Sequence, residues 1–364
     1  MVEVIKIGNK TLVMDGKILS LFWRGQLLRR MVYVGYGLFD NSNDGEWVVY
    51  IKIPITTIPT EDAQYRVVID PTYVSVYNVE GTLKTQSDIA LEFWKYVRSD
   101  GKDIRVFNQN REQLYFWIEK FDYTNKRCVI WVLLPKDSSE LNIAIGNPVA
   151  SESSYNNGDE VFEFFDDFLG TALDTNKWVQ TYGTSDMVKV SNSELTLITD
   201  GNTTVAIATR TTHGLTNFIL YAKVKFPDDP SSDRGGVIYR DTQSGAPNNY
   251  SVDVFSKETE PDVRWNTYVG SWGSEESFYS PLEVDTYYIW SIVKQGSDFQ
   301  AKAHDIEYNV LGESSVRTVG DYLGYIWLIM SELSPANHRF VVDWIFMVKL
   351  ADPAEFGTPQ VSTF

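Results

Sequence analysis

Beyond residue 160 the chain is made of short apolar runs separated by turn residues, and no long amphipathic helical stripe interrupts them. The runs are rich in the β-branched and aromatic residues that favour strands. Eleven such runs in about 190 residues are typical of a two-sheet jelly roll. They span residues 187–190, 194–198, 204–209, 217–226, 236–240, 250–255, 263–269, 287–294, 299–304, 323–330 and 339–350.

A second set of strand-like runs lies before residue 150, between two polar segments at 40–45 and 151–159. Its spacing is typical of a β-sandwich. We therefore expect an all-β protein with an amino-terminal arm (1–45), a β-sandwich (46–150), a jelly roll (160–350) and a tail (351–364) that lies as loop. The strands expected in the first sandwich span residues 47–54, 65–69, 89–97, 104–107, 114–121 and 128–134.

The arm differs in charge from the rest of the chain. Residues 1–45 carry six basic and four acidic residues, whereas the remainder carries 26 basic and 45 acidic ones. Asp15 and Gly16 predict a hairpin between two short strands, and residues 24–30 fit either a helix or a strand. The arm is expected to anchor the protein to a partner or particle, or else to cover a sheet edge.

The formal net charge of −17 argues against nucleic acid and anionic membranes as partners, since both are negatively charged and bind positively charged protein surfaces. No stretch reaches the length of a membrane span, and no signal peptide is visible at the amino terminus. Cys128 is the single cysteine, so no intrachain disulfide forms. A single cysteine fits either a reducing compartment or an extracellular protein that relies on a large core.

An ordered set of short motifs runs through the first sandwich. Residues 100–107 read DGKDIRVF, residues 115–119 read YFWIE, residues 130–132 read IWV, and residues 145–148 read IGNP. In this order they closely resemble the family known as domain of unknown function 2341, over about residues 46–150. One departure is Ile145, where the family often has Tyr before Gly-Asn-Pro.

The string at residues 163–178, EFFDDFLGTALDTNKW, begins the jelly roll. It resembles the entry strand of concanavalin A-like (laminin G-like) jelly rolls in archaeal, bacterial and viral surface proteins. The resemblance implies that the run at 341–348 closes the fold beside this strand. It also implies a virion, extracellular or cell-surface location, and a glycan or a host or cell-surface protein as partner. Homo-oligomerisation, or assembly on a larger particle, would raise the avidity of weak contacts.

A structural calcium ion is one expectation for this end of the jelly roll. Asp166 and Asp167 in the entry strand and Asp343 in the closing strand would meet if the two strands are neighbours, and calcium prefers such oxygen ligands. Related jelly rolls often carry calcium there. The alternative is that these aspartates cap a turn or face solvent.

Catalysis is not the leading expectation. The laminarinase-type signature Glu-x-Asp-x-Glu, which sets three acids on one strand face, is missing from the sequence. The acids at 258–262 are interrupted by Pro261 and predict a turn, and no histidine lies in a nucleophile motif. A divergent glycoside hydrolase, with two acids from different strands, stays open as the alternative function.

A cluster of aromatic residues between 265 and 279 is the best candidate for a binding surface. Aromatic faces in loops form platforms for sugar rings. By strict alternation Trp265 faces the core, whereas Tyr268 faces outward with Arg264. We expect non-enzymatic recognition, with a purely architectural role as a further alternative. The candidate ligand-binding residues are Arg264, Tyr268, Trp272 and Tyr279.

Overall fold

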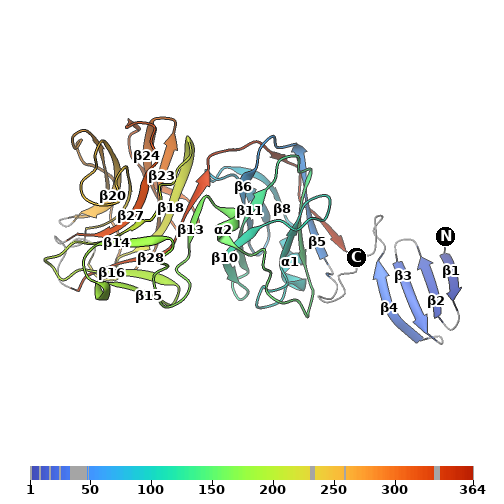
Figure 1. Ribbon diagram of the computed structural model, residues 1–364. Coiled ribbons are helices and arrows are strands. Elements are labelled where there is room, and N and C mark those ends of the chain that lie inside the picture. Colours follow the sequence, from blue (N-terminus) through green and yellow to red (C-terminus); the bar gives the residue numbers. More distant parts are fainter. Residues whose placement is uncertain are drawn as a thin grey trace. The chain divides into compact units, whose positions relative to one another are not determined.

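The computed structural model describes residue 47 and residues 49–229, 234–257, 260–331 and 337–363, together with the backbone of residues 2–7, 10–15, 18–23 and 26–32. The chain divides into two compact units. The first comprises residues 1–78, 82–157 and 353–364, and the second comprises residues 79–81 and 158–352. The strands of both units are drawn in Figure 1.

The amino-terminal strands form an antiparallel meander in the order β1-β2-β3-β4. Asp15 on β2 pairs with Ile18 on β3, which confirms the predicted hairpin. The segment that fitted either a helix or a strand ends in strand β4, whereas the linker expected at 40–45 lies outside the described residues. The strands are β1 (Val2–Ile7), β2 (Lys10–Asp15), β3 (Ile18–Trp23) and β4 (Gln26–Val32).

The rest of the first unit contains two further antiparallel sheets, ordered β10-β11-β6-β7-β8 and β29-β5-β12-β9. Their fully buried side chains include Ile51 on β5 and Val67 on β6. The strands are β5 (Val49–Thr57), β6 (Ala63–Ile69), β7 (Val74–Tyr77), β8 (Leu83–Ser87), β9 (Arg105–Phe107), β10 (Phe116–Asp122), β11 (Arg127–Leu134) and β12 (Glu140–Ile145).

The expected strand at residues 89–97 is wrong, because this segment forms helix α1 (Ala90–Tyr96). Ala90, Phe93 and Trp94 are its buried residues. Their i, i+3, i+4 spacing places them on one helical face. The Trp94 indole nitrogen donates to the carbonyl of Asp70 at 2.7 Å, which fixes the helix against the turn after β6.

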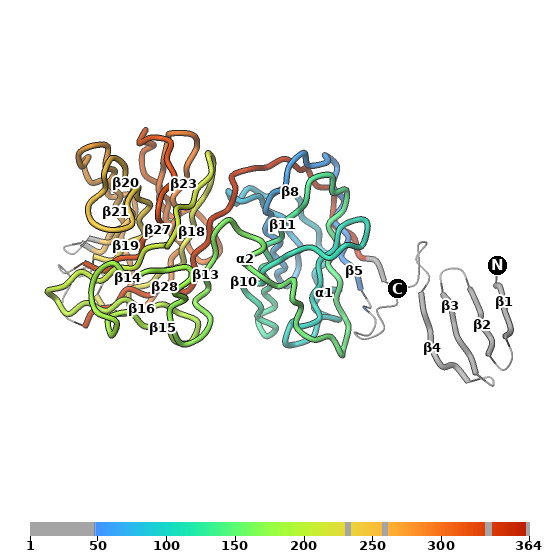
Figure 2. Tube along the Cα trace, viewed as in Figure 1, coloured from blue at the N-terminus to red at the C-terminus, as the bar shows by residue number. Residues whose placement is uncertain are grey.

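The expectation that the tail lies as loop is also wrong. Residues 353–364 belong to the first unit, where β29 (Glu355–Phe356) and β30 (Gln360–Thr363) both pair with β5. Figure 2 shows this carboxyl-terminal segment, in red, beside β5. The backbone hydrogen bonds of β5 and the burial of Phe356 explain why the tail is ordered. The first unit is therefore discontinuous in sequence.

The second unit is a sandwich of two antiparallel sheets, which confirms the all-β jelly roll. One sheet has the order β15-β16-β28-β18-β23-β24-β25, with β13 on β28 and β26 on β24, and the other has the order β14-β17-β27-β19-β20-β21-β22. A single cluster of buried side chains, including Trp178, Trp265 and Trp290, draws on strands of both sheets.

The strands of the nine-stranded sheet are β13 (Phe164–Asp166), β15 (Val188–Ser191), β16 (Glu194–Ile198), β18 (Asn217–Lys225), β23 (Tyr288–Gln295), β24 (Asp298–His304), β25 (Val310–Glu313), β26 (Arg317–Thr318) and β28 (Arg339–Lys349). Two short helices, α2 (Gly158–Val161) and η1 (Ser185–Met187), lie before β13 and β15. Phe165 on β13 pairs with Phe346 on β28, so the entry and closing strands are neighbours as predicted.

The seven-stranded sheet carries the predicted ligand-binding residues Arg264 and Tyr279 and the outer face described below. Its strands are β14 (Trp178–Tyr182), β17 (Val205–Thr209), β19 (Gly235–Arg240), β20 (Tyr250–Lys257), β21 (Glu260–Val269), β22 (Glu276–Tyr279) and β27 (Tyr325–Met330). Val237, Val254 and Leu328 belong to the central core. Because side chains alternate along a strand, Ile238, Asp253 and Trp327 belong to the opposite face, which we call the outer face.

Candidate functional site

The motif DGKDIR of the first unit begins with a tight turn. Gly101 has a φ of +68°, and an added Cβ would lie 3.0 Å from the ring of Phe121. The backbone N–H of Lys102 donates to the carboxylate of Asp100 at 3.2 Å. The turn therefore requires glycine for two reasons, backbone conformation and the space taken by the aromatic ring.

Asp103 in the middle of the motif is fully buried and binds backbone rather than a ligand. Its carboxylate accepts from the amide of Arg98 at 3.1 Å and from the amide of Gly146 at 2.7 Å. Desolvation raises the pKa of this carboxyl, although the backbone amides act in the opposite direction. Asp103 thus fastens the turn after β12 to the loop after α1.

Two arginines of this region, like Asp103, form hydrogen bonds with the backbone. Arg105 donates to the carbonyl of Ser151 at 2.7 Å and to that of Lys102 at 2.9 Å, and Arg98 donates to the carbonyl of Ala150 at 2.6 Å. Such charge-assisted bonds hold the segment that follows β12. The residues that carry the sequence resemblance therefore form a structural clamp.

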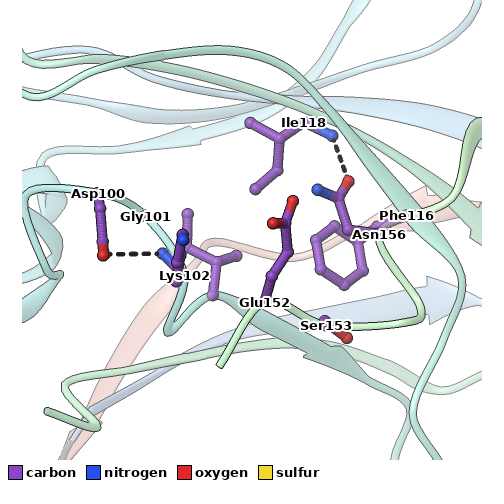
Figure 3. Close-up of a pocket in the computed structure, with 9 residues that line it drawn as sticks. Asp100, Gly101, Lys102, Phe116, Ile118, Glu152, Ser153 and Asn156 are labelled. Atoms are coloured by element: carbon purple, nitrogen blue, oxygen red, sulfur yellow. Dashed lines mark hydrogen bonds between the residues drawn. The ribbon is translucent and has the colours of Figure 1, made fainter. Parts of the chain in front are cut away.

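A small open cavity of about 70 Å³ lies beside this clamp. Its apolar wall is made by Ile104, Phe116 and Ile118, and its polar residues are Asp100, Lys102, Glu152, Ser153 and Asn156. Figure 3 shows the Glu152 side chain reaching into the cavity toward Asn156, whose amide oxygen accepts from the N–H of Ile118. The sequence motifs contain the residues of one wall of this cavity, but no motif indicated that Glu152 and Asn156 line it as well.

In the jelly roll, the outer face of the seven-stranded sheet carries one row of paired residues across five strands. Trp327 pairs with Ala208 and Ile238, Ile238 pairs with Asp253, and Asp253 pairs with Asn266. Apolar and aromatic side chains lie at one end of this row, and polar ones at the other. All of these side chains are buried, so the row forms a covered layer of the outer face rather than an exposed surface.

A buried ion pair lies on this face. Arg240 lies 3.3 Å from the carboxylate of Asp253, donates to Ser251 at 3.2 Å, and covers the ring of Trp327 at 5.1 Å from its centroid. Ser251 also donates to Asp253. Burial raises the pKa of the Asp253 carboxyl, while Arg240 acts against that shift. Asp253 is thus fully occupied by its neighbours.

The structure brings only two of the four predicted binding residues together. The rings of Tyr268 and Trp272 meet edge to face with centroids 5.2 Å apart, and 49% of Trp272 is exposed. Tyr279 instead packs near Tyr288, and burial raises its pKa to about 12. Trp265 belongs to the core, as alternation predicts.

Arg264 is held by carboxylates of its own sheet. Its Nε atom donates to Asp262 at 2.9 Å, and its Nη1 atom lies 3.9 Å from Glu275. Glu275 also lies 3.5 Å from Arg234. The guanidinium therefore helps to order the loop that carries Trp272, and its predicted contact with a ligand stays a prediction.

The three aspartates predicted to bind calcium do not form one cluster. Asp166 is buried and accepts from the indole N–H of Trp178 at 2.6 Å and from the amide of Phe168 at 2.8 Å. Asp343 forms an ion pair with Lys223 at 2.6 Å.

The carboxyl of Asp167 has a raised pKa, first because of burial and second because of Asp166. In the described ranges, no group of three acidic, histidine or cysteine side chains could hold a metal ion. The three aspartates therefore do not converge as one group of ligands in the described residues, and calcium binding stays a prediction.

The described outward side chains of β20 do not repeat the Glu-x-Asp-x-Glu pattern considered in the sequence. On β20 the outward positions are Ser251, Asp253 and Phe255, so a single acid stands where Glu-x-Asp-x-Glu would supply three. The acid cluster expected to form a turn at 258–262 is described only from residue 260 onward, where Glu260 and Asp262 lie on β21.

These features define a two-unit, all-β protein with a clamped β-sandwich and an antiparallel jelly roll. Within it, residues 100–182 match the profile of a family described as "Domain of unknown function (DUF2341)". The match starts later than the expected range of 46–150 and continues past it through β13 into β14. Asp103 and Arg105 of the clamp and the entry string of the jelly roll therefore lie within one family match, whereas Arg98 lies just before it. No curated protein matches the chain.

Solved structures with a similar fold include an endo-acting O-glycanase of the human gut microbiota (12% identity, 52% of this chain and 100% of that one, TM-score 0.43). The laminarinase catalytic domain from Thermotoga maritima is 12% identical, with 52% of this chain and 98% of that one covered and a TM-score of 0.42. A beta-1,3-glucanase from Mycobacterium marinum is 15% identical, with 51% of this chain and 98% of that one covered and a TM-score of 0.40. Because these TM-scores are below 0.5, they do not support the assignment of the fold. The jelly roll assignment rests on the order of strands in the two sheets. In the described part of the chain, no helix is long and apolar enough to cross a membrane.

Proposed function

We propose that this protein recognises glycans without cleaving them, through the edge of the jelly roll's outer face formed by Tyr268 and Trp272. The observation that carries the proposal is the half-exposed indole of Trp272, held against Tyr268 at 5.2 Å between ring centroids. An exposed tryptophan offers a flat apolar surface that packs against the C–H face of a sugar ring.

The loop that presents Trp272 is held by its own backbone. The amide of Val269 donates to the carbonyl of Ser271 at 3.1 Å, and the amide of Gly273 donates to that of Thr267 at 2.9 Å. Gly270 adopts a φ of +68°, which suits the turn between them. A preorganised loop loses little conformational entropy on binding, so one aromatic contact from it gives a higher affinity than the same contact from a flexible loop.

Recognition without turnover is supported by the chemistry of the same face. A retaining glycosidase needs two carboxyl groups about 5–5.5 Å apart. Among the outward positions of β20, Asp253 is the single acid, and Arg240 and Ser251 occupy it. A carboxylate that is buried, paired and hydrogen-bonded is poorly placed to attack a sugar or to protonate a leaving group.

The setting that we propose is a cell or virion surface, with several copies of the chain acting together. The net charge of −17 supports a solvated protein that avoids anionic surfaces, and weak single-site sugar contacts gain strength through multivalency. Size-exclusion chromatography with light scattering tests the assembly. A strictly monomeric chain at working concentration would overturn that part of the proposal.

A glycan array probed with the full chain tests the central function, together with a reducing-end assay on every polysaccharide that binds. The proposal expects binding to a defined group of glycans and no release of reducing ends. The control is the variant Tyr73→Ala, which removes a similarly exposed aromatic residue from the first unit. An array without hits would favour a purely architectural protein, and turnover would show an enzyme.

A further inference from the structure

The cavity beside the clamp of the first unit has groups that neither the fold nor the clamp uses. Within the described residues, the carboxylate of Glu152 forms no hydrogen bond or ion pair, and the ammonium group of Lys102 forms none either. Both residues line the cavity, and both are solvent-exposed. A free acceptor and a free donor therefore border the same small space.

Asn156 adds a second donor in a fixed orientation. Its amide oxygen accepts from the backbone N–H of Ile118 at 3.0 Å, so its amide nitrogen is turned the other way. Figure 3 draws this amide and the Glu152 carboxylate among the residues that line the cavity. The cavity is therefore bordered by one acceptor group and one further donor group.

The size and the apolar wall limit what can enter. The volume of about 70 Å³ has room for roughly five water molecules, or for one edge of a small ring. Ile104 and Phe116 form an apolar wall behind the polar groups. A peptide aromatic side chain would leave the polar groups unpaired, which is costly.

The charges on the rim select the chemistry further. An anion is attracted by Lys102 but repelled by Asp100 and Glu152, whereas a cation is attracted by these two carboxylates but repelled by Lys102, so a neutral group avoids both repulsions. A hydroxyl group can donate to a carboxylate and accept from an ammonium or amide group at once. Two adjacent hydroxyl groups on an aliphatic ring would satisfy these groups and still contact the apolar wall.

We propose that this cavity is a second saccharide site, which binds the vicinal diol of a single terminal sugar through Glu152, Asn156 and Lys102. The site lies in the first unit and does not depend on Trp272. The protein would then hold a glycan chain end in one unit and a sugar face in the other.

Saturation-transfer NMR and calorimetry with the full chain and methyl glycosides of glucose, galactose, mannose and N-acetylglucosamine test the site. The proposal expects weak binding of at least one, lowered about tenfold by Glu152→Gln, since a hydrogen bond to a charged group is lost. The single variant Lys102→Met should also lower the monosaccharide affinity, by more than Glu152→Gln does. The matched control is Glu92→Gln on α1, which should leave the monosaccharide affinity unchanged.

Two results would overturn the second site. One is no binding of any of these sugars by the folded wild-type chain, and the other is binding that Glu152→Gln and Lys102→Met both leave unchanged. If monosaccharide binding were lost with Trp272→Ala but not with Glu152→Gln, the jelly roll would be the only sugar site. Because the two sets of variants lie in different units, the failure of one proposal does not hide the other.

Discussion

The carboxyl-terminal strand β29 should stabilise the first unit although residues 158–352 of the second unit separate it from strands β5 to β12. Phe356 is buried, and its ring meets the ring of Tyr65 edge to face with centroids 4.9 Å apart. Beside it, the amide of Ala354 donates to the Tyr65 hydroxyl at 3.0 Å. Replacement of a buried Phe by Ala typically costs about 3–5 kcal/mol. Because β29 is a two-residue strand at a sheet edge, we expect about 3 kcal/mol for Phe356→Ala.

Hydrogen exchange with mass spectrometry can assign this loss to one unit. A cost of about 3 kcal/mol should speed the exchange of the most protected amides of β5 and β6 by about a hundredfold, since exchange from globally open states follows the free energy of opening. Amides of β18 and β28 in the jelly roll should keep their wild-type rates. The control is Leu323→Ala, an exposed apolar residue of the second unit.

The reasoning would be refuted if Phe356→Ala left β5 and β6 as protected as in the wild type. It would equally be refuted if β18 and β28 exchanged faster by the same factor, because the tail would then not belong to the first unit. A chain that ends at residue 352 lacks both β29 and β30. It should show a larger effect in the same strands.

Three further predictions concern buried and paired carboxylates. Asp103→Ala leaves the amides of Arg98 and Gly146 without their acceptor, so urea unfolding of the first unit should show a loss of about 2–3 kcal/mol, and no loss would contradict the clamp. Glu276 accepts from Ser315 and Trp265, and its pKa is lowered from 4.5 to about 2, with burial opposing the shift. The stabilisation by the Glu276 carboxylate is therefore complete above about pH 4.5 and is lost as the pH falls toward 2. Glu276→Gln should reduce the dependence of the melting temperature on pH in that window. Finally, a chelator should leave the melting temperature unchanged, and a drop would show a metal site that the described carboxylates do not reveal.

Local sequence patterns predicted the elements whose signals lie within a few residues. The hairpin at Asp15, the inward position of Trp265 and the strand runs of the jelly roll follow from turn chemistry and period-two alternation. Helix α1 was missed because its aromatic residues favour strands, while only Ala90, Phe93 and Trp94 mark a helical face.

Long-range partners explain most of what the sequence did not predict. The pairing of β30 with β5 joins Val361 to Ile51, and nothing local to a four-residue strand indicates so distant a partner. Asp103 stood out within its motif, but its structural role depends on Gly146, more than forty residues away. Arg264 lies beside Asp262 and Glu275, contacts that the alternation of the strand alone did not indicate, and its role in ligand binding stays a prediction.

The most direct test of the account is the affinity of wild type and Trp272→Ala for the glycan that binds best on the array, measured by calorimetry. If a sugar ring covers roughly 60 Å² of the indole, the contact contributes about 1.5 kcal/mol, or about tenfold in affinity. The account predicts a loss of about that size for Trp272→Ala and none for Tyr73→Ala. Equal affinities of wild type and Trp272→Ala would contradict recognition at this face.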